Sequence, residues 1–377
     1  MSKADNQKKL DELRAAIDAV DDELLALIQK RAGLAAQVGA HKENQGHGPY
    51  YVPSREAEII RRLLAKKDGS VPDAALHGIF REIIGACLAL EHPVTITYLG
   101  PEGTFTYMAA TRQFGSAANY HACKNLGDVF DEVESGRAAY GVVPVENAFE
   151  GAVTHTLDLF VDRDVSICAE ILLGIHHCLL SHATQLGDIE VVLSHPQALG
   201  QCRKWLQSNM PGVQMVEVAS TARAAEMIGQ VKNGDISDAD WNWRRMAAIG
   251  SLAVAECWNL PVLREHVEDY PDNTTRFLVI GAHDSPPSGE DKTALILSIK
   301  DEPGALHALL GPFSDRGIGL SRIASRPSKK KIWEYVFFVD LEGHRTEANV
   351  QAALDEVLAM PGGYVKVLGS YPVSKPL

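Results

Sequence analysis

The stretch LDELRAAIDAVDDELLALIQKRAGLAAQVGAHK, residues 10–42, decides how this chain begins to fold. It contains no proline, and its apolar side chains recur every three or four residues, the spacing of one face of a long α-helix. The members of this apolar seam are Leu10, Leu13, Ile17, Val20, Leu24, Leu27, Leu34 and Val38. Arg31 occupies a seam position where a leucine is expected. We therefore predict a helix over residues 10–42 whose core-facing side carries a cation.

The misplaced arginine predicts a ligand. An unpaired charge on a buried helix face costs many kcal/mol, and the seam itself contains no acidic residue to pair with Arg31. The simplest explanation is an anionic ligand enclosed by helices. Lys42 follows eleven residues later, about three turns and roughly 16 Å along the same face. Two long cations that converge on one pocket suit a small dicarboxylate.

The composition is that of a globular protein with more than one domain. The chain has 377 residues, 46% of them hydrophobic and 23% charged, which predicts two or three domains. Its formal net charge of −13 argues against nucleic acid as a partner. The six cysteines form no CxxC pair, so we expect buried free thiols, no disulfides and no metal site.

The ends and the hydropathy of the chain give its expected location. The first nine residues are polar and lack a signal-peptide core, and no stretch is apolar for long enough to span a bilayer. We expect a cytoplasmic protein with no membrane partner.

Residues 1–92 have the pattern of three helices. Pro53 suits the first turn of a second helix that ends near Asp68 and Gly69, and Pro72 opens a third helix that stops before Pro93. Three helices, one of them this long, do not enclose a core of their own. We therefore predict an intertwined homodimer, or a higher homo-oligomer, in which a second copy supplies the missing helices.

Residues 93–282 alternate apolar runs with helical patterns, which predicts an α/β domain with parallel sheets and crossover helices. Several runs end in a small polar turn that opens a helix, at residues 100–106, 194–197, 220–221 and 250–251. Ligands bind at such carboxyl ends of strands, with anions against helix N-termini. The polar stretch 232–245 predicts a surface insertion to which we assign no function.

The C-terminal part begins with AHDSPPSGEDK at residues 282–292, which has the composition of a linker. We place the linker itself at residues 283–292. The pattern of residues 293–377 then predicts, in order, a strand, a helix, two strands, a helix and a strand, over 293–299, 304–316, 320–326, 332–341, 346–360 and 364–371. This βαββαβ order is that of a ferredoxin-like α+β unit.

Motifs in all three segments resemble one family, the bifunctional chorismate mutase–prephenate dehydratases of phenylalanine biosynthesis. LDELRAAID, VGAHK and SREAE in residues 1–92 resemble the all-helical chorismate mutases. GPEGTFT, VVPVENAFEGAV, SHPQALGQC and NTTRFLVIG in residues 93–282 resemble prephenate dehydratase, which implies a two-lobed domain like that of periplasmic binding proteins. DEPGALHALL and IASRP in residues 293–377 resemble an ACT regulatory domain.

For the mutase, the resemblance implies a pericyclic conversion of chorismate to prephenate that needs fixed cations and hydrogen-bond donors but no cofactor. It implies that Arg31 holds a substrate carboxylate and that Lys42 reaches the ether oxygen. Arg14 lies roughly 100° off the face of Arg31, and the family lends this arginine to the partner subunit. The remaining residues implied are Arg55, Glu56 (for the substrate hydroxyl), Cys87 and Glu91. Taken alone, Arg14, Arg55 and Glu91 would more often be solvated helix charges.

The mutase segment departs from the family pattern at three positions. Val52 replaces a carboxylate often found there, and Cys87 replaces a serine that contacts the substrate. Glu91 stands where some members have a glutamine that donates to the ether oxygen. A carboxylate cannot donate, so we expect Glu91 to act in its protonated form.

For the dehydratase, the resemblance implies conversion of prephenate to phenylpyruvate. Thr275, with Arg276 and Phe277 of the TRF motif, is implied for substrate binding, and Thr275 for donation to the leaving hydroxyl. Because a threonine is a poor acid, Glu146 or His195 could be the true proton source, although His195 could also be only a strand-end cap. The other implied residues of this cleft are Thr104, Asn147, Gln197, Gln201 and Ser251. Backbone N–H groups around Gly103 and Ser251 are expected carboxylate seats.

For the ACT segment, the resemblance implies phenylalanine as a feedback inhibitor that binds between ACT domains of a dimer. The residues implied are Gly304, Ala305, Leu306, Ser325 and Arg326. Ala324 replaces the usual glutamate of the second motif, and Gly319 stands where a polar residue commonly holds the amino group. These two departures leave two alternatives open: phenylalanine binds more weakly, or regulation has drifted away from phenylalanine.

Other functions remain open on the residues alone. The C-terminal region could be a non-catalytic binder of an amino acid or small anion, attached to a mutase. A mutase joined to prephenate dehydrogenase would need a dinucleotide-binding GxGxxG after an early strand, and the chain has none.

Overall fold

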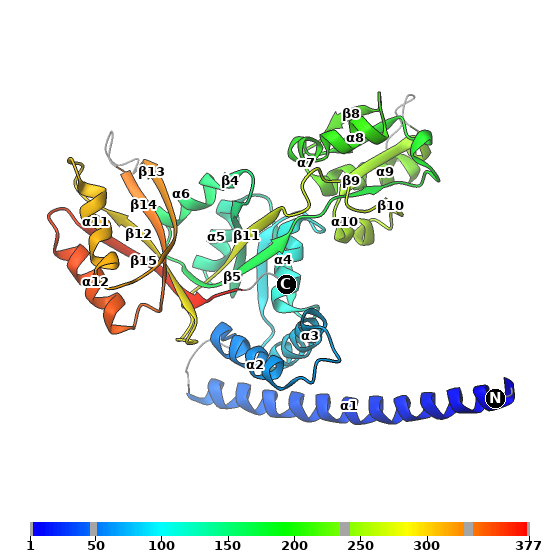
Figure 1. Cartoon of the computed structure of the whole chain (residues 1–377), viewed down its shortest axis with the longest axis horizontal. Coiled ribbons are helices and arrows are strands. Elements are labelled where there is room, and N and C mark those ends of the chain that lie inside the picture. The colour runs from blue at the N-terminus through cyan, green and yellow to red at the C-terminus, as the bar shows by residue number, and fades with distance from the viewer. Residues whose placement is uncertain (1–2, 46–50, 234–241, 328–334, 375–377) are drawn as a thin grey trace.

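The computed structural model describes residues 3–45, 51–233, 242–327 and 335–374. Over these ranges the chain forms a helical N-terminal region, a region with two sheets and a C-terminal unit with one sheet (Figure 1). None of the described helices is both long and apolar enough to cross a membrane. Most of the predicted insertion, residues 234–241, and residues 332–334 of a predicted strand lie outside the described ranges.

The N-terminal region consists of three helices, as predicted. α1 (Lys3–Gln45) is unbroken and longer at both ends than expected, α2 (Pro53–Lys66) begins at its proline, and α3 (Asp73–Glu91) follows Pro72. α1 packs along α3, and its N-terminal half extends alone (Figure 1). The apolar seam of α1 is 42–62% exposed, so within one chain it is not the buried stripe that its spacing predicts. A contiguous apolar face of this kind marks an interaction surface.

The first sheet of the middle region has the strand order β2–β1–β3–β11–β5, with β4 paired to β3. The strands are β1 (Thr95–Leu99), β2 (Asn119–Cys123), β3 (Tyr140–Asn147), β4 (Gly151–Ala152), β5 (Ser166–Gly174) and β11 (Thr274–Gly281). Three helices pack against this sheet, namely α4 (Phe105–Phe114), α5 (Leu126–Glu134) and α6 (Thr154–Asp162). We call this sheet and its helices the first lobe.

The second sheet has the order β10–β6–β9–β7–β8. Its strands are β6 (Cys178–Leu180), β7 (Val191–Ser194), β8 (Gln214–Glu217), β9 (Met246–Gly250) and β10 (Val262–Arg264). Its helices are α7 (Pro196–Gln201), α8 (Arg203–Asn209), α9 (Thr221–Asn233) and α10 (Leu252–Cys257), with 3-10 turns η1 (Leu186–Asp188) and η2 (Trp243–Arg245). We call this sheet and its helices the second lobe.

Both sheets are mixed, which corrects the prediction of parallel sheets. β1 runs parallel to β2 and β3, but β11 runs antiparallel to β3 and β5. In the second lobe β7 is parallel to β8 and β9, whereas β6 is antiparallel to β9 and β10. The chain leaves the first lobe after β5 and re-enters it as β11, so these strands run in opposite directions. An apolar run indicates a buried strand but not its direction.

The C-terminal unit confirms the predicted βαββαβ order. It contains β12 (Asp291–Ser298), α11 (Ala305–Ser314), β13 (Leu320–Pro327), β14 (Tyr335–Glu342), α12 (Ala348–Ala359) and β15 (Tyr364–Pro372). The strands form an antiparallel sheet in the order β13–β14–β12–β15. Leu309 and Phe313 of α11 and Val350 and Val357 of α12 are fully buried in one core with the sheet.

The C-terminal unit is not loosely tethered, although the sequence before it has a linker composition. Ser285 Oγ accepts a hydrogen bond from the Ser54 N–H at 3.0 Å, and the Ser285 N–H donates to the Ser370 carbonyl at 3.1 Å. Tyr371 and Phe338 share a core with Leu278 of β11. The predicted linker is therefore packed where the helical region, the first lobe and the C-terminal unit meet.

Candidate active sites

The first candidate site lies where α1 packs on α3. Lys42 Nζ lies 3.8 Å from Glu91 Oε2, and both side chains are largely buried. Arg31 reaches the same face of α3, where its Nη1 donates to the Ile83 carbonyl at 3.5 Å. Cys87, one turn before Glu91, is buried. The structure thus brings together four of the residues predicted for the mutase, namely Arg31, Lys42, Cys87 and Glu91.

The electrostatics of this group centre on Glu91. Its burial raises the pKa of the carboxyl group, while the nearby Lys42 and Arg31 lower it, and the net direction is upward. A raised pKa keeps a larger fraction of Glu91 protonated near neutral pH. This is the form in which the side chain can donate a hydrogen bond.

Three other predicted mutase residues lie apart from this group in the single chain. Arg14 is exposed on α1, 3.6 Å from Asp11. Arg55 is exposed on α2 and pairs with Glu58 at 2.5 Å. Because neighbouring residues of a helix point about 100° apart, Glu56 faces elsewhere than Arg55.

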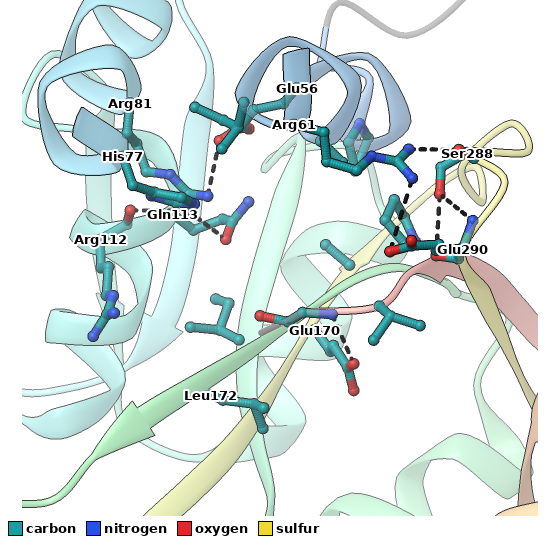
Figure 2. A pocket seen from close by; sticks show the side chains of 18 of the residues that line it. Glu56, Arg61, His77, Arg81, Arg112, Gln113, Glu170, Leu172, Ser288 and Glu290 are labelled. Carbon is teal, nitrogen blue, oxygen red and sulfur yellow. Dashed lines mark hydrogen bonds and ion pairs between the residues drawn. The ribbon is translucent and has the colours of Figure 1, made fainter. Parts of the chain in front are cut away.

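Glu56 faces a cavity between the helical region and the first lobe (Figure 2). The cavity measures about 440 Å³ and is lined by α2 and α3, by α4 and β5, and by the end of the chain after β15. Glu56 is buried there and pairs with Arg81 at 2.9 Å. Burial raises the pKa of Glu56, although Arg81 lowers it. The structure therefore does not bring Glu56 to Arg31 and Lys42 within one chain.

The second candidate site begins at the end of β3, where it pairs with the start of β11. Asn147 and Thr275 face each other in the sheet register, and Asn147 Nδ2 donates to Thr275 Oγ1 at 2.8 Å. The same amide donates to Asn273 Oδ1 at 2.9 Å, and its oxygen accepts from the Phe149 and Glu150 N–H groups. All three polar side chains are buried. Thr275 and Asn147 thus form a fixed polar pair, as the motifs predicted.

The second lobe contributes a further group of polar side chains to this site. Gln197 and Gln201 of α7 both donate to the Glu150 carboxylate, the latter at 2.9 Å. Gln201 Oε1 lies 2.8 Å from Nε2 of the buried His177. His195 caps α7, since its Nδ1 accepts from the Gln197 N–H at 3.3 Å. Glu150 therefore connects both predicted glutamines to the loop that follows Asn147.

The two lobes touch directly at Gly103 and Ser251. Ser251 Oγ donates to the Gly103 carbonyl at 2.9 Å and accepts from the Val254 N–H at the start of α10. Gly103 has a φ of +83°, and an added Cβ would lie 3.1 Å from Val254 Cγ2, so both the turn and the close approach require glycine. Thr104 caps α4 by accepting from the Tyr107 N–H. Two helix N-termini therefore meet here, one from each lobe.

Two predicted cleft residues, Glu146 and Arg276, lie on the opposite face of the sheet. They pair with each other in the strand register, one step from Asn147 and Thr275, and side chains alternate between faces along a strand. Glu146 Oε2 lies 2.8 Å from Arg322 Nε of β13. The expectation that these two side chains line the cleft is therefore corrected. Phe277, also expected there, is buried in the core beneath it.

Arg276 is instead the centre of a buried network with the C-terminal unit. It pairs with Glu170 at 2.9 Å and with Asp340 of β14, and its Nη2 donates to the Tyr371 hydroxyl at 2.8 Å. Lys292 Nζ lies 2.9 Å from the same Glu170 carboxylate. Burial alone lowers the pKa of Arg276. The neighbouring Tyr371, Asp340 and Glu170 raise it by more, so the net direction is upward. The strand positions next to Asn147 and Thr275 are therefore held by the C-terminal unit.

Sequence reasoning missed several residues around the second site. Glu150 and Asn273 lie within the motifs VENAFEGAV and NTTRF, so their positions beside Asn147 and Thr275 were available as a signal. His177 lies outside every motif that we identified, and nothing in the sequence distinguished it. Its burial lowers the pKa of the imidazole, which keeps the side chain neutral.

The third candidate site is a cavity of about 240 Å³ in the C-terminal unit. It is lined by the predicted residues Gly304, Ala305 and Leu306 at the start of α11, and by Tyr335 and Phe337 of β14. Gly304 has a φ of +85°, which an L side chain rarely adopts.

The other two residues predicted for regulation lie on β13, in the sheet that this cavity adjoins. Ser325 is in register with Phe337, one of the cavity's residues. Arg326 pairs with Asp158 of α6 at 2.9 Å, so its guanidinium holds the unit to the first lobe.

Comparison with known proteins agrees with this three-part organisation. Residues 13–92 match the family model Chorismate mutase type II, residues 96–285 match Prephenate dehydratase, and residues 293–359 match ACT domain. A relative from Aquifex aeolicus (strain VF5), named bifunctional chorismate mutase/prephenate dehydratase, is 47% identical over 97% of this chain and 98% of its own. A relative of the same name from Pseudomonas aeruginosa is 44% identical over the same shares.

A solved structure resembles the two-lobed region and the C-terminal unit together. It is the prephenate dehydratase of Arthrobacter aurescens in complex with L-Phe, with a TM-score of 0.65 and 35% identity. The match covers 74% of this chain and 90% of that one.

Proposed function

The chain belongs to the family of bifunctional chorismate mutase/prephenate dehydratases. We propose that it converts chorismate to prephenate at the first candidate site and prephenate to phenylpyruvate at the second. One site is the group of Arg31, Lys42 and Glu91 on α1 and α3. The other is the polar pair of Thr275 and Asn147, completed by the second lobe. The observation that carries this proposal is that each group is assembled in a different region of the fold, from the motifs of one activity. Incubating the protein with chorismate alone tests it, because phenylpyruvate is then the product, whereas a mutase with a non-catalytic C-terminal region stops at prephenate.

The mutase reaction needs a site that folds a dicarboxylate and stabilises negative charge on the breaking ether bond. Arg31 holds one carboxylate of chorismate, and Lys42 and protonated Glu91 donate to the ether oxygen. Arg14 is too far off this face of α1 to serve the same pocket, so a second copy of the chain supplies it. Pairing of two exposed α1 seams in a homodimer covers their apolar faces at the same time.

Mutase activity is expected to fall as the pH rises through the raised pKa of Glu91, because the ionised carboxylate cannot donate. Glu91→Gln carries an amide donor at every pH, so its profile of kcat/KM against pH should be flatter over this range. The measurement is the initial rate of chorismate loss in buffers of constant ionic strength. Glu23→Gln, which removes an exposed carboxylate of α1, is the matched control and keeps the original profile. An unchanged profile in Glu91→Gln would remove Glu91 from the mechanism.

The dehydratase reaction breaks two bonds of prephenate at once. The electron pair of the bond that releases carbon dioxide moves into the ring and completes its aromatic system. The ring hydroxyl leaves at the same time and becomes water when it gains a proton. No general base is needed, but the leaving hydroxyl needs a donor. Thr275, oriented by Asn147, donates to that hydroxyl. Because Glu146 is committed to Arg322 on the other face of the sheet, we assign the proton source to His195.

The two lobes enclose this second site between them, in the manner of periplasmic binding proteins. Prephenate lies between them, with its carboxylates on the N–H groups at the starts of α4 and α10, around Gly103 and Ser251. Gln197 and Gln201 of the second lobe, both bonded to Glu150 of the first lobe, close the site and position the substrate. Contact between the lobes excludes water from the reacting centre.

Phenylalanine regulates the dehydratase through the C-terminal unit. The cavity at Gly304, Ala305 and Leu306 takes the amino acid, with its carboxylate at the N-terminus of α11. The solved relative from Arthrobacter aurescens, a complex with L-Phe, supports this choice of effector. The two ion pairs Arg322–Glu146 and Asp340–Arg276 then transmit the effect, since each joins this unit to a strand position beside Asn147 or Thr275.

Phenylalanine is expected to bind and to inhibit the dehydratase, and Arg322→Ala is expected to weaken the inhibition while leaving binding intact. Loss of one coupling contact changes the coupling free energy by about 0.5–2 kcal/mol, which is a change of about 2- to 30-fold in inhibition. Isothermal titration measures binding, and phenylpyruvate formation from supplied prephenate measures inhibition. Arg316→Ala removes an ion pair within the C-terminal unit, to Glu356, and serves as the control. Absence of heat with phenylalanine would leave this unit as a dimerisation domain.

A further inference from the structure

Two connections join the first lobe to the second, and both carry potential metal ligands. One connection runs from β5 to β6 and contains His176. The other runs from β10 back to β11 and contains His266 and Glu268. The connections are bonded to each other, since the Val267 N–H donates to the His177 carbonyl at 2.9 Å. Side chains from two distant parts of the sequence therefore meet at this crossing.

The two imidazoles approach the same oxygen of the Glu268 carboxylate. Nδ1 of His176 lies 2.9 Å from Glu268 Oε1, and Nδ1 of His266 lies 3.2 Å from the same oxygen. All the ligand atoms lie within 4.8 Å of one another. The Glu268 side chain is only 3% exposed, whereas the two imidazoles are 48% and 62% exposed. The carboxylate is therefore fixed from within, and the two rings cover it from the solvent side.

We propose that His176, His266 and Glu268 form a binding site for a divalent transition-metal ion of the Zn²⁺ class, at the crossing between the lobes. Two imidazole nitrogens and one carboxylate oxygen are a common ligand set for zinc with one open position. Bonds of about 2.0–2.2 Å in a tetrahedral site place ligand atoms roughly 3.3 Å apart. The two nitrogen–oxygen spacings of 2.9 and 3.2 Å approach this value, and the widest spacing among the ligand atoms, within 4.8 Å, must shorten by rotation of the exposed rings.

The surroundings of the three ligands leave room for the rings and hold the carboxylate in place. An added Cβ at Gly174 would lie 3.1 Å from His176 Nε2, so the glycine provides the space beside that ring. His266 has a φ of +53°, a conformation unusual for a residue other than glycine. The Glu268 carboxylate is held from its other side, because Oε2 accepts from the His177 N–H at 2.9 Å. A buried carboxylate that is already fixed in position is a suitable ligand for a cation.

The position of the site links it to the dehydratase cleft. Glu268 Oε2 accepts from the His177 N–H at 2.9 Å, so a metal on Oε1 leaves this second contact in place. His177 in turn contacts Gln201, whose amide donates to Glu150. A bound ion therefore holds the two connections together. It also fixes His177, which contacts Gln201 of the cleft. None of the three proposed ligands takes part in the proposed chemistry, so the test of metal binding needs no substrate.

Metal binding to the untagged full-length chain tests the proposal directly. Equilibrium dialysis against Zn²⁺ is expected to give one ion per chain, and Co²⁺ in its place is expected to give the visible absorption of a four-coordinate ion. The double variant His176→Gln/His266→Gln removes two ligands from exposed positions, so the fold is retained. Its Zn²⁺ affinity should fall by at least about tenfold, since even partners of metal ligands are worth 10- to 100-fold. Its four-coordinate Co²⁺ spectrum should be lost as well.

The matched control is His121→Gln/His155→Gln, which removes two exposed histidines of the first lobe that make no contact with Glu268. This variant should bind Zn²⁺ as the unaltered chain does. Three outcomes would each overturn the proposal: no Zn²⁺ bound by the unaltered chain, equal affinity in the His176/His266 variant, or a six-coordinate Co²⁺ spectrum.

Discussion

Thr275→Ala is expected to abolish phenylpyruvate formation from prephenate and to leave the conversion of chorismate to prephenate unchanged. Thr275 is buried at the start of β11, where its hydroxyl is held by Asn147 at 2.8 Å. The substitution removes a hydrogen-bond donor to the leaving hydroxyl, and loss of one such donor in an active site costs about 10²- to 10³-fold in kcat. Both rates are measured on one preparation, with chorismate and prephenate supplied separately.

The controls for this variant separate chemistry from packing. Loss of one buried hydrogen bond costs about 1 kcal/mol of stability, so thermal unfolding should shift only slightly. Thr275→Val, which keeps the shape and removes the hydroxyl, should be as inactive as Thr275→Ala, whereas Thr275→Ser should retain activity. Thr274→Ala alters the preceding residue of the strand and should keep both activities. Equal loss of both activities in Thr275→Ala would argue against separate sites.

Arg31→Leu is expected to abolish the mutase and to spare the dehydratase. Leucine suits the apolar seam of α1, so the helix and its packing on α3 should be preserved or improved. The variant removes a fixed cation that holds a substrate carboxylate, and loss of one such electrostatic contact costs about 10²- to 10³-fold in rate. Chorismate loss is the measured rate, with prephenate turnover as the internal control. Lys30→Leu removes the adjacent exposed cation of α1 and should leave both rates unchanged.

The sequence predicted those features that depend on local pattern. Helical spacing and two prolines were enough for α1, α2 and α3, and the alternation of strands and helices was enough for the βαββαβ unit. The motifs also predicted that Asn147 and Thr275 belong to one site, and the structure places them in contact. Their roles in catalysis stay predictions.

The direction in which a side chain points in the folded protein could not be predicted in this way. Glu146 and Arg276 belong to the same motifs as Asn147 and Thr275, but the alternation of side chains along paired strands turns them toward the C-terminal unit. Arg55 and Glu56 are adjacent in the sequence, yet the packing of α2 exposes one and buries the other beside Arg81. The seam of α1 is exposed in the described part of the chain, and its covering by a second copy stays a proposal.

The most direct test of the account is to mix the two inactive variants, Arg31→Leu and Thr275→Ala, in the presence of chorismate. Neither alone should yield phenylpyruvate, because each lacks one of the two steps. In the mixture, Thr275→Ala makes prephenate and Arg31→Leu consumes it, so we predict that phenylpyruvate accumulates. A mixture that yields no phenylpyruvate, although each variant retains its other activity, would contradict the claim that the two reactions take place at two independent sites.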